Sequence, residues 1–196
     1  IFFLGFNRRF SPPILKIKSL LNNIDSPKSF VYTINAGRLN KDSWIKDEKI
    51  GGGRLISEVC HFLDLLVFLT DEKIIDFSIN SLENDLDDCF VLSLKFSNGS
   101  LGSINYFSNG HDRVSKENLK IFTDGKYLEL HNFLSIKGKG WKNFSSKIFF
   151  GQQKGHKECI NNFISTIEKG LSSPMKLEDI FHVSELSIKI NDALKK

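Results

Sequence analysis

The chain has 196 residues, which is enough for one domain with a sizeable buried core. With 40% hydrophobic and 26% charged residues it has the composition of a globular protein, and a net charge of +4 demands neither a nucleic acid nor a membrane partner. No apolar run approaches the ~20 residues of a membrane span, and three widely spaced cysteines argue against a disulfide scaffold or zinc ribbon, which predicts reduced thiols and a cytoplasmic location.

The first residues predict the end of a strand followed by a helix. Residues 1–6 begin directly in an apolar run and lack an initiating Met, so we expect them to complete a strand of an upstream domain. Residues 1–11 are accordingly assigned to the end of a missing N-terminal domain and its junction, and residues 12–196 to one domain. Ser11 and the two prolines after it are typical of a helix start. Alternating apolar residues over 30–36 then predict a strand.

A long polar loop and an apolar helix form the middle of the chain. Residues 37–53 are mostly polar and long enough for a functional loop. The helix expected from Gly51 to about Thr70 is apolar around most of its circumference, which predicts that it is buried. Its polar side chains fall in one arc and are Arg54, Ser57, Glu58, His61 and Asp64. Ionisable groups enclosed in this way are costly unless they pair or function, so the arc predicts a site.

The second half predicts a meander followed by two helices. Strand-like runs cover residues 74–79, 90–96, 101–107, 119–122 and 127–134, and turn signals at 97–99 and 124–125 favour hairpins. A short acidic loop is expected at 83–88. The closing helices are marked by Ile160, Phe163, Ile164 and Ile167, and by Leu177, Ile180, Phe181 and Ile188. The predicted fold class is α+β, with an open, mainly antiparallel sheet and helices packed on one face.

His61 is the strongest candidate for chemistry. Glu58 precedes it and Asp64 follows it by three residues, so both neighbour it on the helix surface. A carboxylate bound to one ring nitrogen would leave the other as a base near neutral pH. The alternative is a buried histidine with only a structural role. We predict no metal here, since no second His has the required spacing and Cys60 points about 100° away.

Other motifs allow two interpretations each. Gly51–Gly53 before a helix suits an anion at the first amides, or only a tight turn. Arg8 and Arg9 suit a clamp for phosphate or carboxylate, or a solvated boundary. Arg38 and Trp44 are candidates because they lie in the loop before the helix. Lysines 137, 139 and 142 around Trp141 suit a single-strand nucleic-acid loop, a weaker alternative, and we predict no nucleic acid partner.

Four segments resemble the C-terminal half of Gfo/Idh/MocA-type oxidoreductases, most closely a bacterial, two-part branch associated with polysaccharide pathways. They are GFNRRFSPP, NAGRLNKDSWIKDEKIGGGRL, EVCHFLDLL and PMKLEDI. The resemblance implies a missing Rossmann domain that binds most of NAD(P), and an open sheet that forms a homodimer or higher oligomer. It implies hydride transfer between nicotinamide and a carbon of a sugar, nucleotide sugar or polyol.

The resemblance also implies roles for individual residues. His61 matches the family's proton-handling His, Asp64 an acidic residue one turn later, and Arg9 a basic residue at the junction. We expect Glu58 and Asp64 to orient His61. The expected substrate contacts are Arg54, Arg9, Trp44 and Arg38, and the expected cofactor contacts are Arg8, Gly52 and Gly53.

The chain departs from the family pattern in two ways. Ser57 stands where many members carry Asp, and neither G-x-G-x-x-G nor Glu-Lys-Pro occurs in the chain. The first departure favours an alternative function, a non-catalytic module for dimerisation or scaffold assembly.

Overall fold

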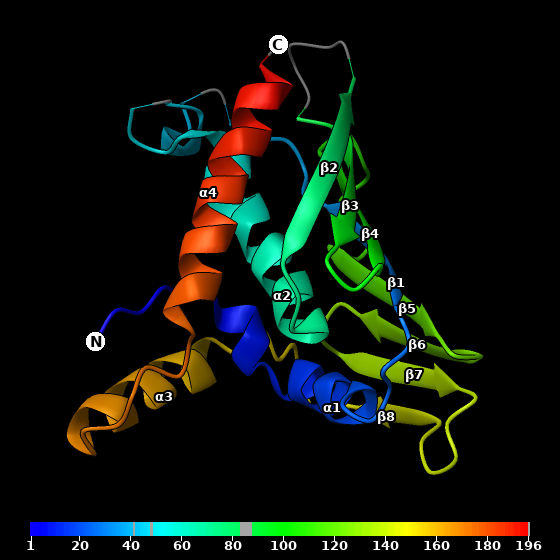
Figure 1. The fold of residues 1–196 in the computed structure, drawn as a ribbon. Coiled ribbons are helices and arrows are strands. Elements are labelled where there is room, and N and C mark those ends of the chain that lie inside the picture. Colours follow the sequence, from blue (N-terminus) through cyan, green and yellow to red (C-terminus); the bar gives the residue numbers. More distant parts are fainter. Residues whose placement is uncertain (41, 48, 83–87, 196) are drawn as a thin grey trace.

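One eight-stranded sheet organises the protein, with the strand order β2-β3-β4-β1-β5-β6-β7-β8 (Figure 1). The computed structural model describes residues 1–40, 42–47, 49–82 and 88–195, so all of the expected acidic loop except residue 88 lies outside it. The strands are β1 (Ser29–Asn35), β2 (Ile74–Ser81), β3 (Phe90–Phe96), β4 (Leu101–Phe107), β5 (Glu117–Thr123), β6 (Lys126–His131), β7 (Ser135–Lys139) and β8 (Ser146–Ile148). β1 and β4 run parallel, and the other neighbouring pairs are antiparallel.

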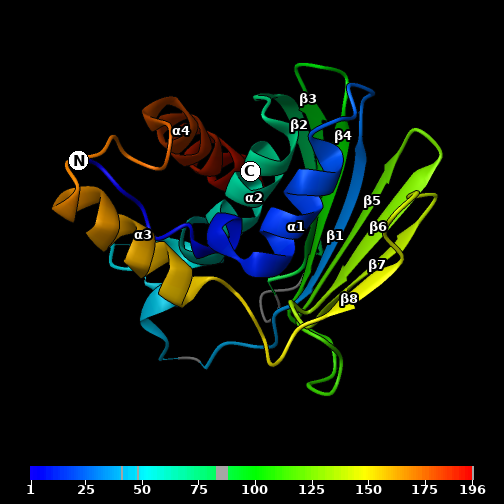
Figure 2. The ribbon, with the colours of Figure 1, turned by 90° about the horizontal axis from the view of Figure 1, so that it is seen from below.

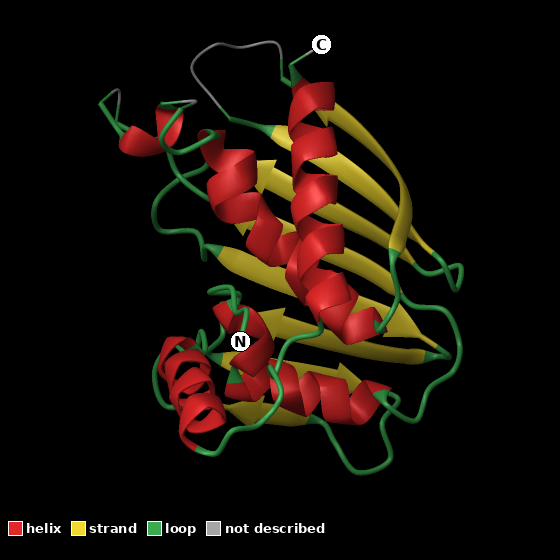
Figure 3. Cartoon of the chain, turned by 60° about the vertical axis from the view of Figure 1, so that its left-hand side comes forward, coloured by secondary structure: helices red, strands yellow, loops and turns green. Residues whose placement is uncertain are grey.

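All four α-helices lie on one face of this sheet, and the other face is open (Figures 2 and 3). They are α1 (Pro12–Leu21), α2 (Cys60–Thr70), α3 (His156–Glu168) and α4 (Leu177–Leu194). Short helical turns precede α1 at Asn7–Phe10 and α2 at Leu55–Val59, and a third lies at Trp44–Lys46. The predicted α+β class, with an open, mainly antiparallel sheet and helices on one face, is confirmed.

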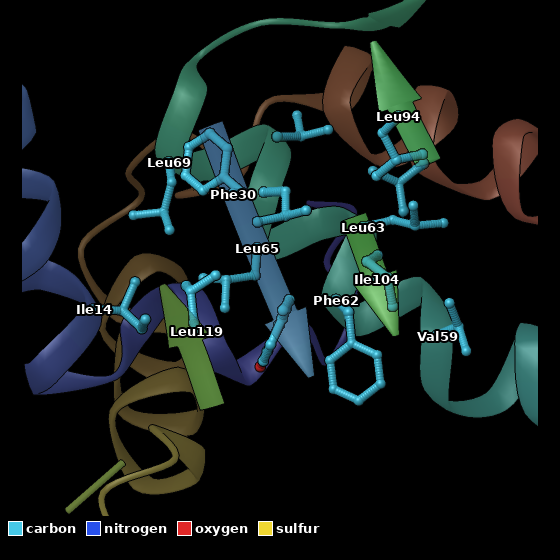
Figure 4. Packing of buried hydrophobic residues seen from close by; sticks show 14 of the residues in the cluster. Ile14, Phe30, Val59, Phe62, Leu63, Leu65, Leu69, Leu94, Ile104 and Leu119 are labelled. Atoms are coloured by element: carbon cyan, nitrogen blue, oxygen red, sulfur yellow. The ribbon is translucent and has the colours of Figure 1, made fainter. Parts of the chain in front are cut away.

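The core lies between α2 and the covered face of the sheet. Along β3, β4 and β1 every second side chain is buried, as expected for strands with one covered face. α2 is apolar almost all round because it packs against the strands on one side and against α1 and α4 on the others. Figure 4 shows this contact, with side chains of α2 next to Phe30, Leu94, Ile104 and Leu119.

The prediction of one strand over residues 127–134 is wrong, since β6 ends at His131 and a turn follows. Asn132 and Phe133 both adopt positive φ, at 46° and 58°. Phe133 is fully buried, so an apolar residue that reads as part of a strand instead anchors the turn. The chain then returns as β7 and β8, which the sequence did not predict. Left-handed backbone at a Phe is uncommon, and the apolar pattern alone gave no sign of it.

Helices α3 and α4 occur where predicted, but α3 turns most of its apolar residues outward. Ile160, Ile164 and Ile167 are each about half exposed, at 58%, 46% and 53%. The buried residues of this helix are Cys159 and Thr166. The apolar spacing therefore predicted the position of the helix correctly. The face of α3 that packs against the domain is not the face that carries these isoleucines.

Candidate active site

Three glycines set the direction in which the chain enters the helix that carries His61. Gly52 and Gly53 have φ of +67° and +81°, which residues with a Cβ rarely adopt. A Cβ on Gly51 would lie 2.5 Å from the Trp44 carbonyl oxygen, so the two segments pack too closely for any side chain. The Gly52 amide donates to the Asp47 carbonyl and is not available to an anion. The tight-turn interpretation of these glycines is thus the one that the geometry supports.

The helix does not begin as an α-helix. Residues Leu55–Val59 form a π-helical turn, and regular α2 begins only at Cys60. A π turn holds more residues than an α turn, so side chains before and after it no longer share the arc drawn at 100° per residue. As a result Glu58 and His61 contact different neighbours.

His61 lines a cavity of about 470 Å³ where the N-terminal segment, the start of α2 and α4 meet. The lining residues are Leu4, Gly5, Phe6, Ile56, Ser57, Cys60, His61, Ser184, Ser187 and Ile188. The imidazole packs edge-on against Phe6, with ring centroids 5.5 Å apart. Nδ1 of the ring is buried and has no hydrogen-bond partner among the described residues.

The electrostatic surroundings keep His61 neutral. Burial, and then the positive charge of Arg8, lower the pKa of the imidazole to about 4. At neutral pH the ring is therefore uncharged and able to accept a proton. Ser57, one turn earlier, donates its hydroxyl to the Gly53 carbonyl at 2.9 Å and so does not contact the ring.

The expectation that Asp64 orients His61 is wrong, because Asp64 pairs with Arg9. The guanidinium of Arg9 donates through Nε and a terminal nitrogen to the two carboxylate oxygens of Asp64. Both side chains are at most 4% exposed, and Asp179 of α4 lies 3.6 Å from the same guanidinium. Arg9 is thus enclosed and is not available to a substrate. The pair ties the N-terminal junction to α2.

Arg8, expected at the cofactor, is likewise engaged inside the protein. It donates twice to Glu117, at 2.9 Å each, and its guanidinium lies over the ring of Phe62. Tyr32 and Lys154 bind the same carboxylate at 2.6 and 2.8 Å. Although burial opposes ionisation, Arg8 and Lys154 lower the pKa of Glu117 to about 2.

Glu117 was not predicted as a functional residue, although the sequence holds a signal for it. The residue alternates with Leu119 and Ile121 and therefore takes a core position of β5. A carboxylate at such a position predicts a buried cationic partner. The two arginines at the junction were the available partners.

Glu58 points toward the sheet and not toward His61. Its carboxylate accepts a hydrogen bond from Tyr106 at 2.7 Å and lies 3.9 Å from Nζ of Lys116. Tyr106 in turn accepts from Arg54 at 2.6 Å. Glu58 therefore does not orient His61, and it does not replace the acid absent at Ser57. Tyr106 itself gave no sequence signal, because it reads as an ordinary core residue of β4.

Arg54 is buried, and Trp44 lies away from the cavity. Arg54 also donates to the Gly37 carbonyl at 2.7 Å and pairs with Asp88 at 3.2 Å, so it is a structural clamp on the loop. Trp44 is 61% exposed and does not wall the His61 cavity. Arg38 lines a different cavity, at the end of the sheet.

Among residues 1–40, 42–47, 49–82 and 88–195, no helix is both long and apolar enough to cross a membrane. The same residues hold no group of three or more His, Cys, Asp or Glu side chains placed to bind a metal ion.

Comparison with known proteins identifies the family. Residues 19–127 match the model of the GFO/IDH/MocA C-terminal domain. A comparison with curated proteins found no match.

Solved structures share the fold at low sequence identity. The chain is similar to a dehydrogenase (MviM) from Clostridium difficile, with 22% identity, a TM-score of 0.75, and coverage of 97% of this chain and 61% of that one. It is similar to aldose-aldose oxidoreductase from Caulobacter crescentus, complexed with glycerol, with 12% identity, a TM-score of 0.77 and coverage of 97% and 60%. It is also similar to GenD2 from gentamicin A biosynthesis, in complex with NAD, with 13% identity, a TM-score of 0.67 and coverage of 93% and 58%.

The chain spans about three fifths of the length of these structures. Their identities are low enough that they establish the shared fold alone, while the family match covers more than half of the chain. The chain therefore belongs to the GFO/IDH/MocA C-terminal domain family.

Proposed function

We propose that this chain is the substrate-binding C-terminal part of an NAD(P)-dependent oxidoreductase that acts on a hydroxyl of a sugar, nucleotide sugar or polyol. The observation that carries the proposal is His61, a neutral imidazole that lines a cavity and has no carboxylate on its ring. Family membership and similarity to an aldose-aldose oxidoreductase support the substrate class.

In this proposal His61 is the general base. Because its pKa is about 4, the ring is unprotonated at neutral pH, as a general base must be before it takes a proton. Nδ1 is buried, so Nε2 is the nitrogen that takes the proton of the substrate hydroxyl. The edge of Phe6 against the ring holds its orientation, a task that sequence reasoning had given to the carboxylates.

Two of the groups expected at the cofactor are engaged within the protein. The Gly52 amide is occupied, Arg8 is bound to Glu117, and no glycine-rich phosphate loop follows a strand in the sequence. We therefore propose that another domain holds NAD(P), with this chain contributing at most the wall around His61. Bound NAD(P) supplies the acceptor for the hydride. The NAD complex of GenD2 supports this choice of cofactor.

An apolar surface supports the presence of such a domain. The N-terminal segment runs between α3 and α4, with Phe3 against Phe163 and Phe2 stacked on Phe181. Exposed apolar side chains lie on this segment, on α3 and α4 and between these helices, namely Ile1, Ile160, Ile164, Ile167, Leu171, Leu177 and Ile188. Exposed apolar patches are typical of contacts with other protein. We propose that the Rossmann domain covers this surface next to the His61 cavity.

The open face of the sheet is the proposed contact between copies. Leu101, Phe122 and Tyr127 lie in one cross-strand row on that face, and Val91 is exposed on β3. Polar residues surround them, which is typical of an interface that also meets water. We propose a homodimer through this face. The three free cysteines agree with a cytoplasmic location, which we propose as well.

The experiment that tests the catalytic proposal is turnover by the full-length protein. His61→Ala should lower kcat at least ~100-fold, the low end for a lost acid–base group. Lys142→Ala is the control, because that side chain is exposed and lines neither this cavity nor the one with Arg38. An unchanged rate for His61→Ala removes the residue from the mechanism.

The second candidate, a non-catalytic module of the same fold, is favoured by one observation. Ser57 replaces the acid of many relatives, and Glu58 is bound to Tyr106, so His61 has no carboxylate partner. A full-length dimer that binds no sugar and no NAD(P) in titrations would establish this alternative over the enzyme.

A further inference from the structure

A cavity larger than the one beside His61 lies at the edge where β1 and β4 end and β5 begins. Its volume is about 980 Å³, which is large enough for a sugar derivative. Asn35 at the end of β1 and most residues of the loop 108–116 line it. It shares no lining residue with the His61 cavity.

The loop is held over the cavity by specific contacts. Nδ2 of Asn35 donates to the carbonyls of His111 and Val114, at 2.8 and 3.1 Å. Gly110 packs so tightly on Asn35 that a Cβ there would lie 2.1 Å from Oδ1. The cavity wall is therefore a defined structure and not a chance hollow in the surface.

The charges that line the cavity are mostly positive. Arg113 and Lys116 contribute two cations, and Arg38 a third that has another interaction. The lining has one carboxylate, Asp112, which is 90% exposed and lies 2.9 Å from Nδ1 of His111. Cations converging on a polar cavity are suited to a carboxylate or a phosphate.

Neutral polar groups complete the lining. The carboxamides of Asn109 and Asn132 offer hydrogen bonds to hydroxyls. Asn35 positions the loop, since its Nδ2 is engaged by two carbonyls and its Oδ1 is buried. The lining thus combines groups for an anion with groups for several hydroxyls.

Lys116 connects this cavity to the start of the His61 helix. Its Nζ lies 3.9 Å from the carboxylate of Glu58, three residues before His61. Lys116 is 41% exposed, so its ammonium is accessible as well as paired. A ligand seated in the cavity would therefore lie beside the segment that leads to the proposed base.

We propose that this cavity binds the acidic group of a sugar, a carboxylate or a phosphate, through Arg113 and Lys116, with Asn109 bonding a hydroxyl. This inference rests on the proposed function, because it names the substrate class of the proposed oxidoreductase. Binding itself does not depend on catalysis, so the two can fail separately.

The test is calorimetric titration of the full-length protein with D-glucuronate and with D-glucose 6-phosphate. D-glucose and inorganic phosphate are the controls for the sugar and for the charge. Arg113→Gln and Lys116→Gln should each raise the Kd of the acidic sugars about tenfold, the effect of one lost charge-assisted contact. Lys142→Gln removes an exposed charge outside the cavity and should change Kd less than about twofold.

Each outcome decides the proposal. Tighter binding of one acidic sugar than of both controls, lost in the two variants, supports it and tells carboxylate from phosphate. Equal binding of D-glucose, equal binding of inorganic phosphate, no binding at millimolar ligand, or equal effects of Lys142→Gln and Arg113→Gln would overturn it. The readouts separate the two claims: the Kd values test the cavity, and the turnover of His61→Ala tests the proposed base.

Discussion

At the scale of single residues, neighbouring arginines at the junction serve two separate buried carboxylates. Arg9 binds Asp64 of α2, and Arg8 binds Glu117 of β5. Burying each charge alone would cost several kcal/mol, and the bidentate contacts offset that cost. The two arginines thus hold the helix layer and the sheet to the same short turn, which explains why neither is available to a ligand.

Breaking the inner pair should destabilise the fold strongly. Asp64→Asn leaves the guanidinium of Arg9 buried with only Asp179 nearby, so we expect a loss of about 3 kcal/mol in the free energy of unfolding. Urea denaturation measures this loss. Glu185→Gln is the control, since its pair with Lys189 is more than 60% exposed on both sides and its loss should leave stability nearly unchanged. Equal losses would contradict the structural role given to Asp64.

The neutral His61 makes a pH-dependent contribution to stability. Its folded pKa of about 4 lies below the ordinary value of 6.5, so the unfolded chain binds the proton more tightly. Stability from this group is full above pH 6.5 and is lost as the pH falls toward 4. Between pH 6.5 and 4.5 the wild type should lose roughly 1–2 kcal/mol more of its free energy of unfolding than His61→Gln does. Thermal unfolding across this range measures it, and an unaltered slope would show that the ring titrates normally.

At the scale of elements, the π turn at Leu55–Val59 decides which side chains meet. A wheel drawn for an α-helix places Glu58, His61 and Asp64 together. The π turn separates Glu58, which contacts the sheet, from His61, which lines the cavity. Asp64 lies with His61 on regular α2, and it binds Arg9 instead of the ring. Such turns are frequent at functional sites. The apolar pattern predicted that a helix is there, and it carried no information about the extra residue.

Helix α3 should depend on a single glycine at its start. Gly155 has φ of +81°, and a Cβ there would lie 2.5 Å from the Asn7 carbonyl oxygen. Gly155→Ala should therefore lower the free energy of unfolding by at least ~2 kcal/mol more than Gly125→Ala. Gly125 is a matched control, with φ of +66° and open space around it, so it carries backbone strain alone. Equal losses in chemical denaturation would show that α3 does not pack tightly on the junction.

At the scale of the whole molecule, the domain leaves two apolar surfaces uncovered, on opposite sides of the helix layer and sheet. One involves the N-terminal segment with α3 and α4, and the other is the row of Leu101, Phe122 and Tyr127 on the open face. Figure 2 shows α3 and α4 on the helix side of the sheet, away from its open face. The proposals give them different partners, the Rossmann domain and a second copy.

Sedimentation of the full-length protein separates these two surfaces. The double variant Leu101→Glu and Phe122→Glu should convert a dimer to a monomer, because two buried carboxylates would face their own copies across the symmetry axis. Ile160→Glu, on the other surface, should leave the dimer intact. A monomeric wild type, or a dimer broken by Ile160→Glu, would refute the assignment to the open sheet.

The sequence by itself determined the fold class, most element positions and the helix that carries His61, because apolar periodicity and turn residues act locally. Only the tertiary structure decided the partners of the charged residues. The sequence predicted ligand contacts for Arg8, Arg9 and Arg54. Each of them instead binds a side chain far along the chain: Arg8 binds Glu117, Arg9 binds Asp64 and Arg54 binds Tyr106. Such pairs depend on which strand and helix lie opposite. A buried charge takes the partner that the packing brings to it, and residue spacing along one element does not encode that neighbour.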